Sequence, residues 1–233
     1  ATGQNAYVPA SSFDGIAAGD GGFCLTTGSG EVWCKSVVLA TGVRHRPLGL
    51  EREEELAGQG VSYCAVCDGA FYKGERVAVV GGGNTALEDA LFLSSYCSEV
   101  LLVHRRETFR AEQRLVERAQ SRSNIQFVRS TVVDGLEGKE ALTGIRLRSS
   151  DGTVSHCEVA GLFVAIGQIP QNERFAGLVD LDEAGYIAAG EDCKTSVPGI
   201  FAAGDCRSKQ LRQLSTAAAD GAVAAMAACA CCN

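Results

Sequence analysis

The chain has 233 residues, of which 46% are hydrophobic and 21% are charged, and its formal net charge is −7. This composition is ordinary for a soluble globular enzyme, and the negative charge argues against nucleic acid as a main partner. The longest Ala-rich apolar stretch, residues 221–232, is shorter than the roughly 20 residues that span a bilayer, and the first residues resemble no signal peptide. We therefore expect a cytoplasmic protein without a membrane segment.

The first elements in chain order are two predicted strands, at residues 23–27 and 32–40, joined by the turn Gly28-Ser29-Gly30. The second strand runs into Thr41-Gly42, a tight turn. Residues 47–60 are polar and acidic and contain several glycines, so we interpret them as a connector.

Cys64 and Cys67 form a Cys-x-x-Cys motif that is followed directly by Asp68. The spacing suits a disulfide that closes and opens with little movement of the backbone. A carboxylate beside it can exchange the proton that a thiolate leaving group requires. Two structural cysteines, or one half of a zinc site, are the alternatives. We favour the redox role because a dinucleotide motif follows shortly afterwards.

The other cysteines of the 11 in the chain are mostly scattered. We expect these to be mostly buried small hydrophobic residues of a protein in a reducing compartment. Cys229, Cys231 and Cys232 lie close together, and we interpret them as a frayed terminus rather than a metal-binding or redox-active tail. No histidine or second Cys-x-x-Cys supports a zinc site, so we expect no metal.

Residues 76–103 predict one βαβ unit, with strands at 77–80 and 100–103. In the turn after the first strand, Gly81 permits the sharp bend and Gly83 lets the backbone approach a pyrophosphate. The small side chain of Ala86 lets the following helix pack closely on the strand. A glycine turn without a ligand is the alternative, but the order of strand, turn and helix favours a dinucleotide site.

The end of the second strand of this unit indicates which dinucleotide binds. NAD-binding units usually carry an acidic residue there, which binds the ribose hydroxyl. This chain has His104-Arg105-Arg106 instead, and Arg110 follows. Guanidinium groups bind a 2′-phosphate through charge-assisted hydrogen bonds, so we expect NADPH rather than NADH. A solvated basic patch is the alternative, and His104 alone would carry no weight.

Further elements are predicted along the rest of the chain. They are a helix at 111–122, strands at 125–128, 144–148 and 162–166, a turn at 182–187, a buried strand at 198–205 and a helix at 215–228. The pattern changes after Pro170, so we expect the last of these elements to belong to another part of the fold.

Transfer of a hydride from a nicotinamide to a disulfide requires a two-electron relay such as a flavin. Five segments together resemble the low-molecular-weight thioredoxin reductases of bacteria and plants, in order and in spacing, over nearly the whole chain. They are residues 60–71, Gly81-Gly82-Gly83-Asn84-Thr85-Ala86, His104-Arg105-Arg106 with Arg110, Ala165-Ile166-Gly167 and residues 195–205.

The resemblance implies an α/β fold: a two-domain, Rossmann-like FAD/NAD(P)-binding pyridine nucleotide-disulfide oxidoreductase. Residues 1–47 would be part of an FAD domain, residues 48–160 an NADPH-binding domain that carries the Cys-x-x-Cys motif, and residues 161–233 the remainder of the FAD domain. The resemblance also implies a homodimer.

By the same likeness, electrons pass from NADPH to FAD, then to the Cys64–Cys67 disulfide and finally to thioredoxin. Cys67 would face the flavin, Cys64 would attack the disulfide of thioredoxin, and Asp68 would act as acid and base. The residues expected to bind NADPH are Gly81, Gly83, Asn84, Thr85, Ala86, His104, Arg105, Arg106 and Arg110. Those expected to bind FAD are Thr41, Gly42, Gly204, Asp205, Arg212 and Gln213. Ile166 and Gly167 complete the set of expected cofactor-binding residues.

One departure from the family concerns its first segment. Family members begin with a strand, a Gly-x-Gly-x-x-Gly turn and a helix that bind the FAD pyrophosphate, and this sequence contains no such segment. We therefore expect an incomplete FAD domain in a piece of a longer reductase. The alternatives are the flavoprotein component of an alkyl hydroperoxide reductase, and a non-enzymatic NADPH-binding redox module without FAD.

Overall fold

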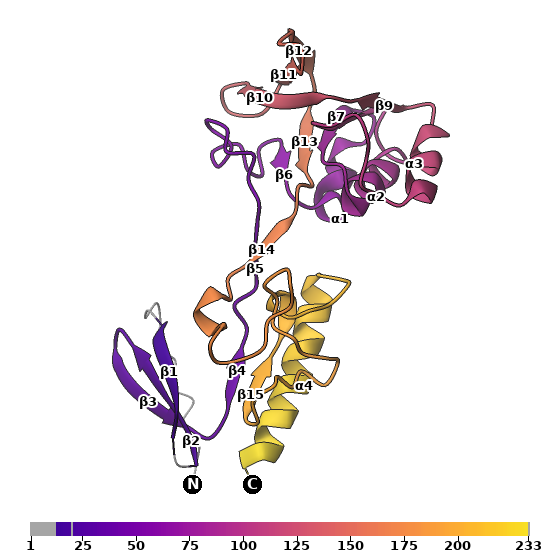
Figure 1. The fold of residues 1–233 in the computed structure, drawn as a ribbon. Coiled ribbons are helices and arrows are strands. Elements are labelled where there is room, and N and C mark those ends of the chain that lie inside the picture. The colour runs from indigo at the N-terminus through magenta and orange to yellow at the C-terminus, as the bar shows by residue number, and fades with distance from the viewer. Residues whose placement is uncertain (1–12, 20, 233) are drawn as a thin grey trace. The chain divides into compact units, whose positions relative to one another are not determined.

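The computed structural model describes residues 13–19 and 21–232 and divides into two compact units (Figure 1). The central unit comprises residues 45–167, and the terminal unit combines residues 1–44 with 168–233. The predicted boundaries were 47/48 and 160/161. The second boundary lies further along the chain because the strand β13 (Gly161–Val164) pairs with β7 (Arg76–Val80) in the sheet of the central unit.

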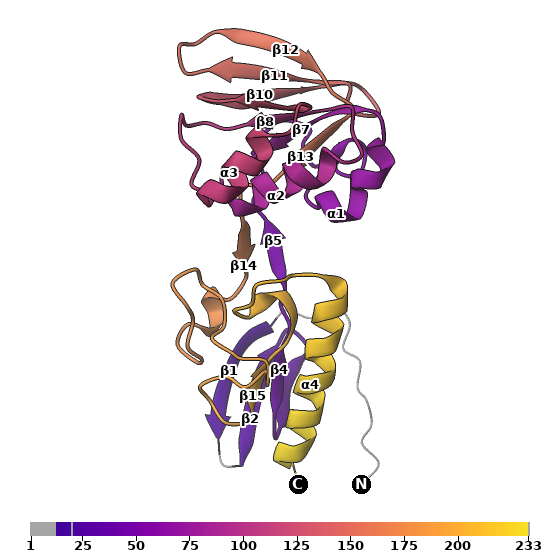
Figure 2. The ribbon, with the colours of Figure 1, turned by 90° about the vertical axis from the view of Figure 1, so that its right-hand side faces the viewer.

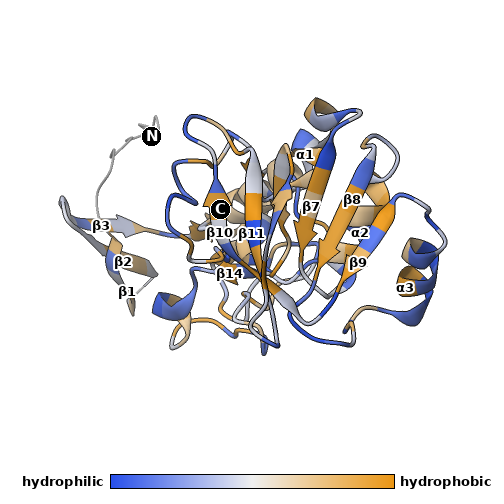
Figure 3. Cartoon of the chain, turned by 90° about the horizontal axis from the view of Figure 1, so that it is seen from above, coloured by the Kyte–Doolittle hydropathy of each residue, from blue (hydrophilic) through white to orange (hydrophobic). Residues whose placement is uncertain are grey.

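A parallel sheet with the strand order β6-β13-β7-β8-β9 forms the middle of the central unit. The other three strands are β6 (Val61–Ser62), β8 (Glu99–Val103) and β9 (Ile125–Val128). Their apolar runs are continuous because both faces of the sheet are covered. Figure 3 shows hydrophobic residues concentrated on β7 and β8. The strands predicted at 77–80, 100–103 and 125–128 are confirmed.

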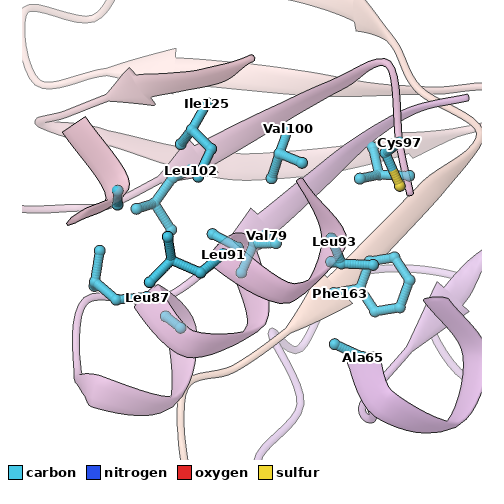
Figure 4. Packing of buried hydrophobic residues seen from close by; sticks show 14 of the residues in the cluster. Ala65, Val79, Leu87, Leu91, Leu93, Cys97, Val100, Leu102, Ile125 and Phe163 are labelled. Carbon is cyan, nitrogen blue, oxygen red and sulfur yellow. The ribbon is translucent and has the colours of Figure 1, made fainter. Parts of the chain in front are cut away.

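Helices cover one face of this sheet (Figure 2). They are α2 (Asn84–Leu93), α3 (Gln113–Gln120) and the short α1 (Ala65–Asp68), which continues into the 3-10 turn Gly69–Tyr72. Apolar side chains of the strands and helices form one buried cluster, in which Figure 4 shows Val79, Val100 and Leu102 beside Leu87 and Leu91. The βαβ unit predicted for residues 76–103 is therefore confirmed.

A three-stranded antiparallel sheet covers the opposite face of the parallel sheet (Figure 2). Its strands are β10 (Thr131–Glu137), β11 (Gly144–Ser149) and β12 (Val154–Glu158). Val133, Ile145 and Leu147 belong to the buried cluster of this face, together with Ala78 and Leu101 of the parallel sheet. Burial on both faces thus makes the central unit a three-layer structure.

The terminal unit contains two small sheets and one long helix. The strands β1 (Phe13–Gly19), β2 (Gly22–Thr27) and β3 (Gly30–Cys34) are antiparallel, and β4 (Val37–Leu39) pairs in parallel with β15 (Ile200–Ala202). The expected single strand at 32–40 is therefore two strands in different sheets. The sequence analysis did not predict β1. Where the chain passes between the units, β5 (Val43–His45) pairs with β14 (Gln168–Pro170).

The helix α4 (Leu214–Cys232) is longer than the predicted helix at 215–228. It packs on the terminal unit through Ala224, which clusters with Phe201 and Ala203. By length and composition alone, this 19-residue helix could cross a membrane, and 11% of the apolar window is buried. The apolar stretch expected from the sequence, residues 221–232, is shorter than this helix because it began after Asp220. A single helix of this kind is weak evidence for a membrane span, and Asp220 within it forms a buried ion pair with Arg207.

Candidate active site

The cysteine motif lies where β6 ends and α1 begins in the central unit. Cys64 and Cys67 form a disulfide with a distance of 5.3 Å between their Cα atoms. Cys64 is the N-cap residue of α1, and its Sγ atom accepts a hydrogen bond from the backbone N–H of Cys67 at 3.2 Å. Cys67 is exposed, whereas Cys64 is half-buried. The predicted disulfide is therefore present, and Cys67 is the more exposed of its two residues.

The carboxylate of Asp68 is connected to the disulfide through Ser62. The Ser62 hydroxyl donates to Oδ2 of Asp68 at 2.6 Å and accepts the backbone N–H of Cys64 at 3.1 Å. Ser62 is buried, so this link is shielded from bulk water. Ser62 was not among the residues predicted from the sequence, and only its position two residues before Cys64 signals it. The arrangement links an acid–base group to the backbone of Cys64.

The glycine turn after β7 forms one wall of a cleft of about 680 Å³ in the central unit. A Cβ atom on Gly81 would overlap the carbonyl oxygen of Ala165, and one on Gly82 would overlap the ring of His104. A Cβ atom on Gly83 would meet nothing within 4 Å. Neighbouring protein atoms therefore leave no room for a side chain at Gly81 or Gly82. Gly83, in contrast, faces open space that a ligand can approach.

The N-terminus of α2 provides backbone donors at this cleft. Its N-cap is Gly83, and no side chain caps the helix. The first N–H groups of such a helix are free to bind a phosphate. The side chain of Asn84 is held by Glu112: its Nδ2 donates to Oε1 at 3.0 Å, and its Oδ1 accepts the Glu112 N–H at 2.8 Å. Thr85 lines the cleft, and Ala86 is fully buried against the sheet.

The predicted basic residues occupy different places around the cleft. Arg105 and Arg110 line it, while Arg106 is exposed and is not among the lining residues. The backbone N–H of Arg110 donates to the carbonyl of Gly82 at 2.8 Å, which ties the arginine segment to the glycine turn. Within residues 13–19 and 21–232, no carboxylate forms an ion pair with any of these three guanidinium groups. The charges of Arg105 and Arg110 are thus available to an anion.

His104 is part of the cleft wall rather than a charged ligand. Its ring is buried beneath Gly82, stacks on Phe109 at 4.9 Å, and lies 3.1 Å from the carbonyl of Thr108. Burial lowers the pKa of His104 below its usual value, which favours the neutral ring. Ile166 and Gly167 line the same cleft, as do Arg46, Leu48 and Thr131, which no sequence signal indicated.

In the terminal unit, the predicted FAD residues gather around the end of β15. Gly204 adopts a φ of +80°, a left-handed conformation that glycine accommodates, and begins the 3-10 turn Gly204–Cys206. Oδ1 of Asp205 is buried and has no hydrogen-bond partner among the residues that the structure describes. A buried acceptor without a donor is costly, so this atom fits a ligand hydroxyl group.

Other predicted FAD residues already have protein contacts. The Arg212 guanidinium lies 4.0 Å from the centre of the Tyr186 ring, and its Nε donates to the carbonyl of Asp205 at 3.3 Å. The backbone N–H of Gln213 donates to Thr216 Oγ1 at 3.2 Å at the beginning of α4. At the end of β4, Thr41 donates to Oδ1 of Asn172 at 3.0 Å, and Gly42 follows with a φ of +65°.

The sequence and fold of this chain are similar to those of known pyridine nucleotide-disulphide oxidoreductases. The family model described as pyridine nucleotide-disulphide oxidoreductase matches residues 9–221. The thioredoxin reductase of Listeria monocytogenes is 44% identical over 202 residues, which are 86% of this chain and 63% of the relative. That of Streptomyces coelicolor is 44% identical over 194 residues, 82% of this chain and 60% of the relative.

Solved structures agree with this assignment. The thioredoxin reductase of Streptococcus pyogenes superimposes with a TM-score of 0.88 at 35% identity and covers 95% of this chain and 73% of its own. That of Giardia duodenalis has a TM-score of 0.86 at 32% identity, with coverages of 95% and 74%. The chain therefore belongs to the pyridine nucleotide-disulphide oxidoreductase family and, within it, to the thioredoxin reductases. It spans 63% of the length of the Listeria relative.

Thioredoxin reductases of this family use FAD and NADPH, and the residues present fit both groups. For NADPH, the open space at Gly83, the uncapped start of α2 and the unpaired guanidinium of Arg105 suit a phosphate-bearing nucleotide. For FAD, the unpartnered Oδ1 of Asp205 suits a hydroxyl group. A carboxylate would repel a phosphate, so a hydroxyl of the ribityl chain is the better partner than the pyrophosphate.

Proposed function

We propose that the protein is an NADPH-dependent, FAD-containing reductase of the thioredoxin disulfide. The observation that carries the proposal is the Cys64–Cys67 disulfide with Asp68 beside it, in the same unit as a cleft suited to NADPH. The central unit is then the NADPH-binding domain, and the terminal unit is the FAD domain. FAD, when bound, supplies the two-electron relay between the nicotinamide and the disulfide.

In the nucleotide cleft, the backbone N–H groups at the start of α2 bind the pyrophosphate of NADPH, and Gly83 lets it approach. Arg105 and Arg110 bind the 2′-phosphate through charge-assisted hydrogen bonds. The tie between Arg110 and Gly82 keeps the two binding elements at a fixed distance, so the pyrophosphate and the 2′-phosphate are recognised together.

At the disulfide, two electrons and two protons convert the Cys64–Cys67 bond to two thiols. The Cys64 thiolate then attacks one sulfur of the thioredoxin disulfide, and the other sulfur of thioredoxin leaves as a thiolate that takes up a proton. Attack of Cys67 on Cys64 reforms the internal disulfide and releases reduced thioredoxin. Asp68, oriented by Ser62, accepts and returns the protons.

The partner and the cellular setting belong to the same proposal. Thioredoxin is the protein substrate, the assembly is a homodimer, and the compartment is the cytoplasm. The exposed side chains of Val66, within the motif, and Phe71, four residues after it, offer an apolar surface for the substrate. The alkyl hydroperoxide reductase component and the FAD-free module are not favoured, because the curated relatives described above are thioredoxin reductases.

An anaerobic absorbance titration of the purified chain, supplied with FAD, tests the proposal. We expect NADPH to bleach the flavin bands and oxidised thioredoxin to restore them. The variant Cys64→Ser/Cys67→Ser should bleach with NADPH but fail to recover with thioredoxin. Bleaching without recovery in the unaltered chain would rule out thioredoxin as the substrate, and no flavin binding would rule out the FAD relay.

A trapping experiment identifies the attacking cysteine. In Cys67→Ser, the free Cys64 should form a mixed disulfide with thioredoxin that survives non-reducing electrophoresis, because the resolving thiol is missing. Cys64→Ser should give little of this product. The opposite result would make Cys67, the more exposed residue, the attacking thiol.

A further inference from the structure

The Gly204–Asp205 turn of the terminal unit is held by a buried ionic cluster that the proposed mechanism does not use. Arg207 exposes 1% of its side chain and binds Asp220 through two parallel hydrogen bonds, from Nε to Oδ2 and from Nη2 to Oδ1, both 2.8 Å long. Lys209 Nζ also donates to Oδ2 of Asp220 at 2.8 Å. The two cations hold the pKa of Asp220 far below its usual range, so this carboxylate is charged.

The fourth bond to Asp220 comes from the turn itself. The backbone N–H of Gly204 donates to Oδ2 of Asp220 at 2.9 Å. Asp220 belongs to α4, whereas Gly204 follows β15, so this bond fixes the turn to the helix. Gly204 has a φ of +80°, and an acceptor for its N–H helps to hold it in that conformation.

The two aspartates of this region therefore differ. Both oxygen atoms of Asp220 are occupied by protein donors, while no donor within residues 13–19 and 21–232 reaches the buried Oδ1 of Asp205. The position of Asp205 follows directly from the conformation of Gly204, its neighbour in the chain. We propose that Asp220 is a positioning residue for FAD: by holding the N–H of Gly204, it aims the carboxylate of Asp205 at a hydroxyl of the cofactor. This inference rests on the proposed FAD binding.

Fluorescence titration of the FAD-free chain with FAD tests the role of Asp220. In Asp220→Ala, the Gly204 N–H loses its acceptor, Lys209 loses its anion and Arg207 keeps only Glu191. We expect the dissociation constant for FAD to rise by at least about tenfold, the loss of one hydrogen bond to a charged group. Glu183→Gln alters an exposed carboxylate of the same unit and should leave FAD affinity unchanged. NADPH binding should persist in both variants and shows that the central unit is folded, and circular dichroism checks the secondary structure of the whole chain.

A second variant separates positioning from stability. Replacing a buried ion pair by apolar residues often restores or raises stability. Arg207→Met/Lys209→Met/Asp220→Leu replaces all three buried charges and should therefore recover the thermal midpoint that Asp220→Ala loses. Because no acceptor for the Gly204 N–H returns, its affinity for FAD should stay low, and its Gly204 peptide should exchange amide hydrogen faster in the FAD-free chain.

The outcomes distinguish this inference from the function on which it rests. A triple variant that binds FAD as tightly as the unaltered chain, with unchanged exchange at Gly204, would show that the cluster serves stability alone and would overturn the inference. Failure of the unaltered chain to bind FAD at all would overturn the proposed FAD relay and the inference together.

Discussion

The two units of this protein differ in how completely they bury their apolar side chains. In the central unit, helices and a second sheet cover both faces of a parallel sheet, and Val77, Ala78 and Val79 are fully buried. In the terminal unit, the parallel pair β4–β15 has two strands, and α4 leaves Leu214 and Met226 88% and 73% exposed.

The binding sites of the two units differ in the same way. In the central unit, neighbouring side chains pack tightly around Gly81 and Gly82 and shape a cleft from residues of that unit. In the terminal unit, Asp205 has a buried oxygen that no donor of the described residues reaches. The comparison teaches that the proposed NADPH site is lined by residues of the central unit, whereas the proposed FAD site contains a polar atom whose partner a ligand would supply.

The largest expected effect concerns the disulfide of the central unit. Cys64→Ser should lower the rate of thioredoxin reduction by about 1,000-fold or more, because no second thiol can take its place. The rate is measured by NADPH oxidation coupled to thioredoxin. Cys229→Ser alters an exposed cysteine of the terminal unit and should leave the rate unchanged. Equal losses in both variants would break the assignment of the redox site to the central unit.

Hydrogen exchange measures the contrast in burial directly. Amides of β7 and β8 should exchange about 100-fold or more slowly than those in the last turns of α4, which has few buried side chains. Mass spectrometry of peptides from the whole chain gives both rates in one sample. Similar protection in α4 and in β7 would contradict the proposed difference.

The arginines should decide the choice between the nicotinamide cofactors. Arg105→Ala/Arg110→Ala removes two donors to the 2′-phosphate, so the preference for NADPH over NADH, as the ratio of kcat/KM values, should fall by about 10- to 100-fold. Arg118→Ala changes an exposed arginine of α3 outside the cleft and serves as the control. An unchanged ratio would mean that these residues form a solvated basic patch.

The glycine turn offers a matched pair of substitutions. Gly82→Ala forces a Cβ atom into the His104 ring and should lower the free energy of unfolding by about 2 kcal/mol, measured with urea. Gly83→Ala meets open space, so stability should stay within about 0.5 kcal/mol. NADPH binding should weaken in Gly83→Ala, because the Cβ atom then occupies the approach to the turn. Equal stability of the two variants would refute this reading of the turn.

The smallest effect is a pH dependence within the central unit. Burial, with help from the charge of Glu88, raises the pKa of Asp89 on α2 to about 7. Between about pH 4 and pH 7 the folded chain keeps a proton that the unfolded chain releases, so the contribution of Asp89 to stability falls as the pH rises.

Asp89→Asn removes this ionisation. It should be more stable than the unaltered chain by about 1 to 2 kcal/mol at pH 8, with a smaller difference at pH 5, in urea unfolding. Glu140→Gln, an exposed residue of the same unit, should keep the original pH dependence. A constant difference between Asp89→Asn and the unaltered chain at both pH values would contradict the raised pKa.

The sequence by itself determined the features that depend on short stretches of chain. The strand, glycine turn and helix around Gly81 and Gly83 follow from local conformational preferences and from apolar spacing. The disulfide between Cys64 and Cys67 needs three residues of separation and one helical turn. For the same reason, the arginines after β8 were recognised as a group from their spacing alone.

Only the tertiary structure decided the contacts between distant segments. The bonds of Asn84 to Glu112 and of Gly204 to Asp220 join residues that different elements bring together. His104 is a cleft wall rather than a charged ligand because packing places its ring under Gly82. Such contacts depend on how helices and strands are stacked, and an apolar or charged pattern along one element does not specify which residue of another element it will meet.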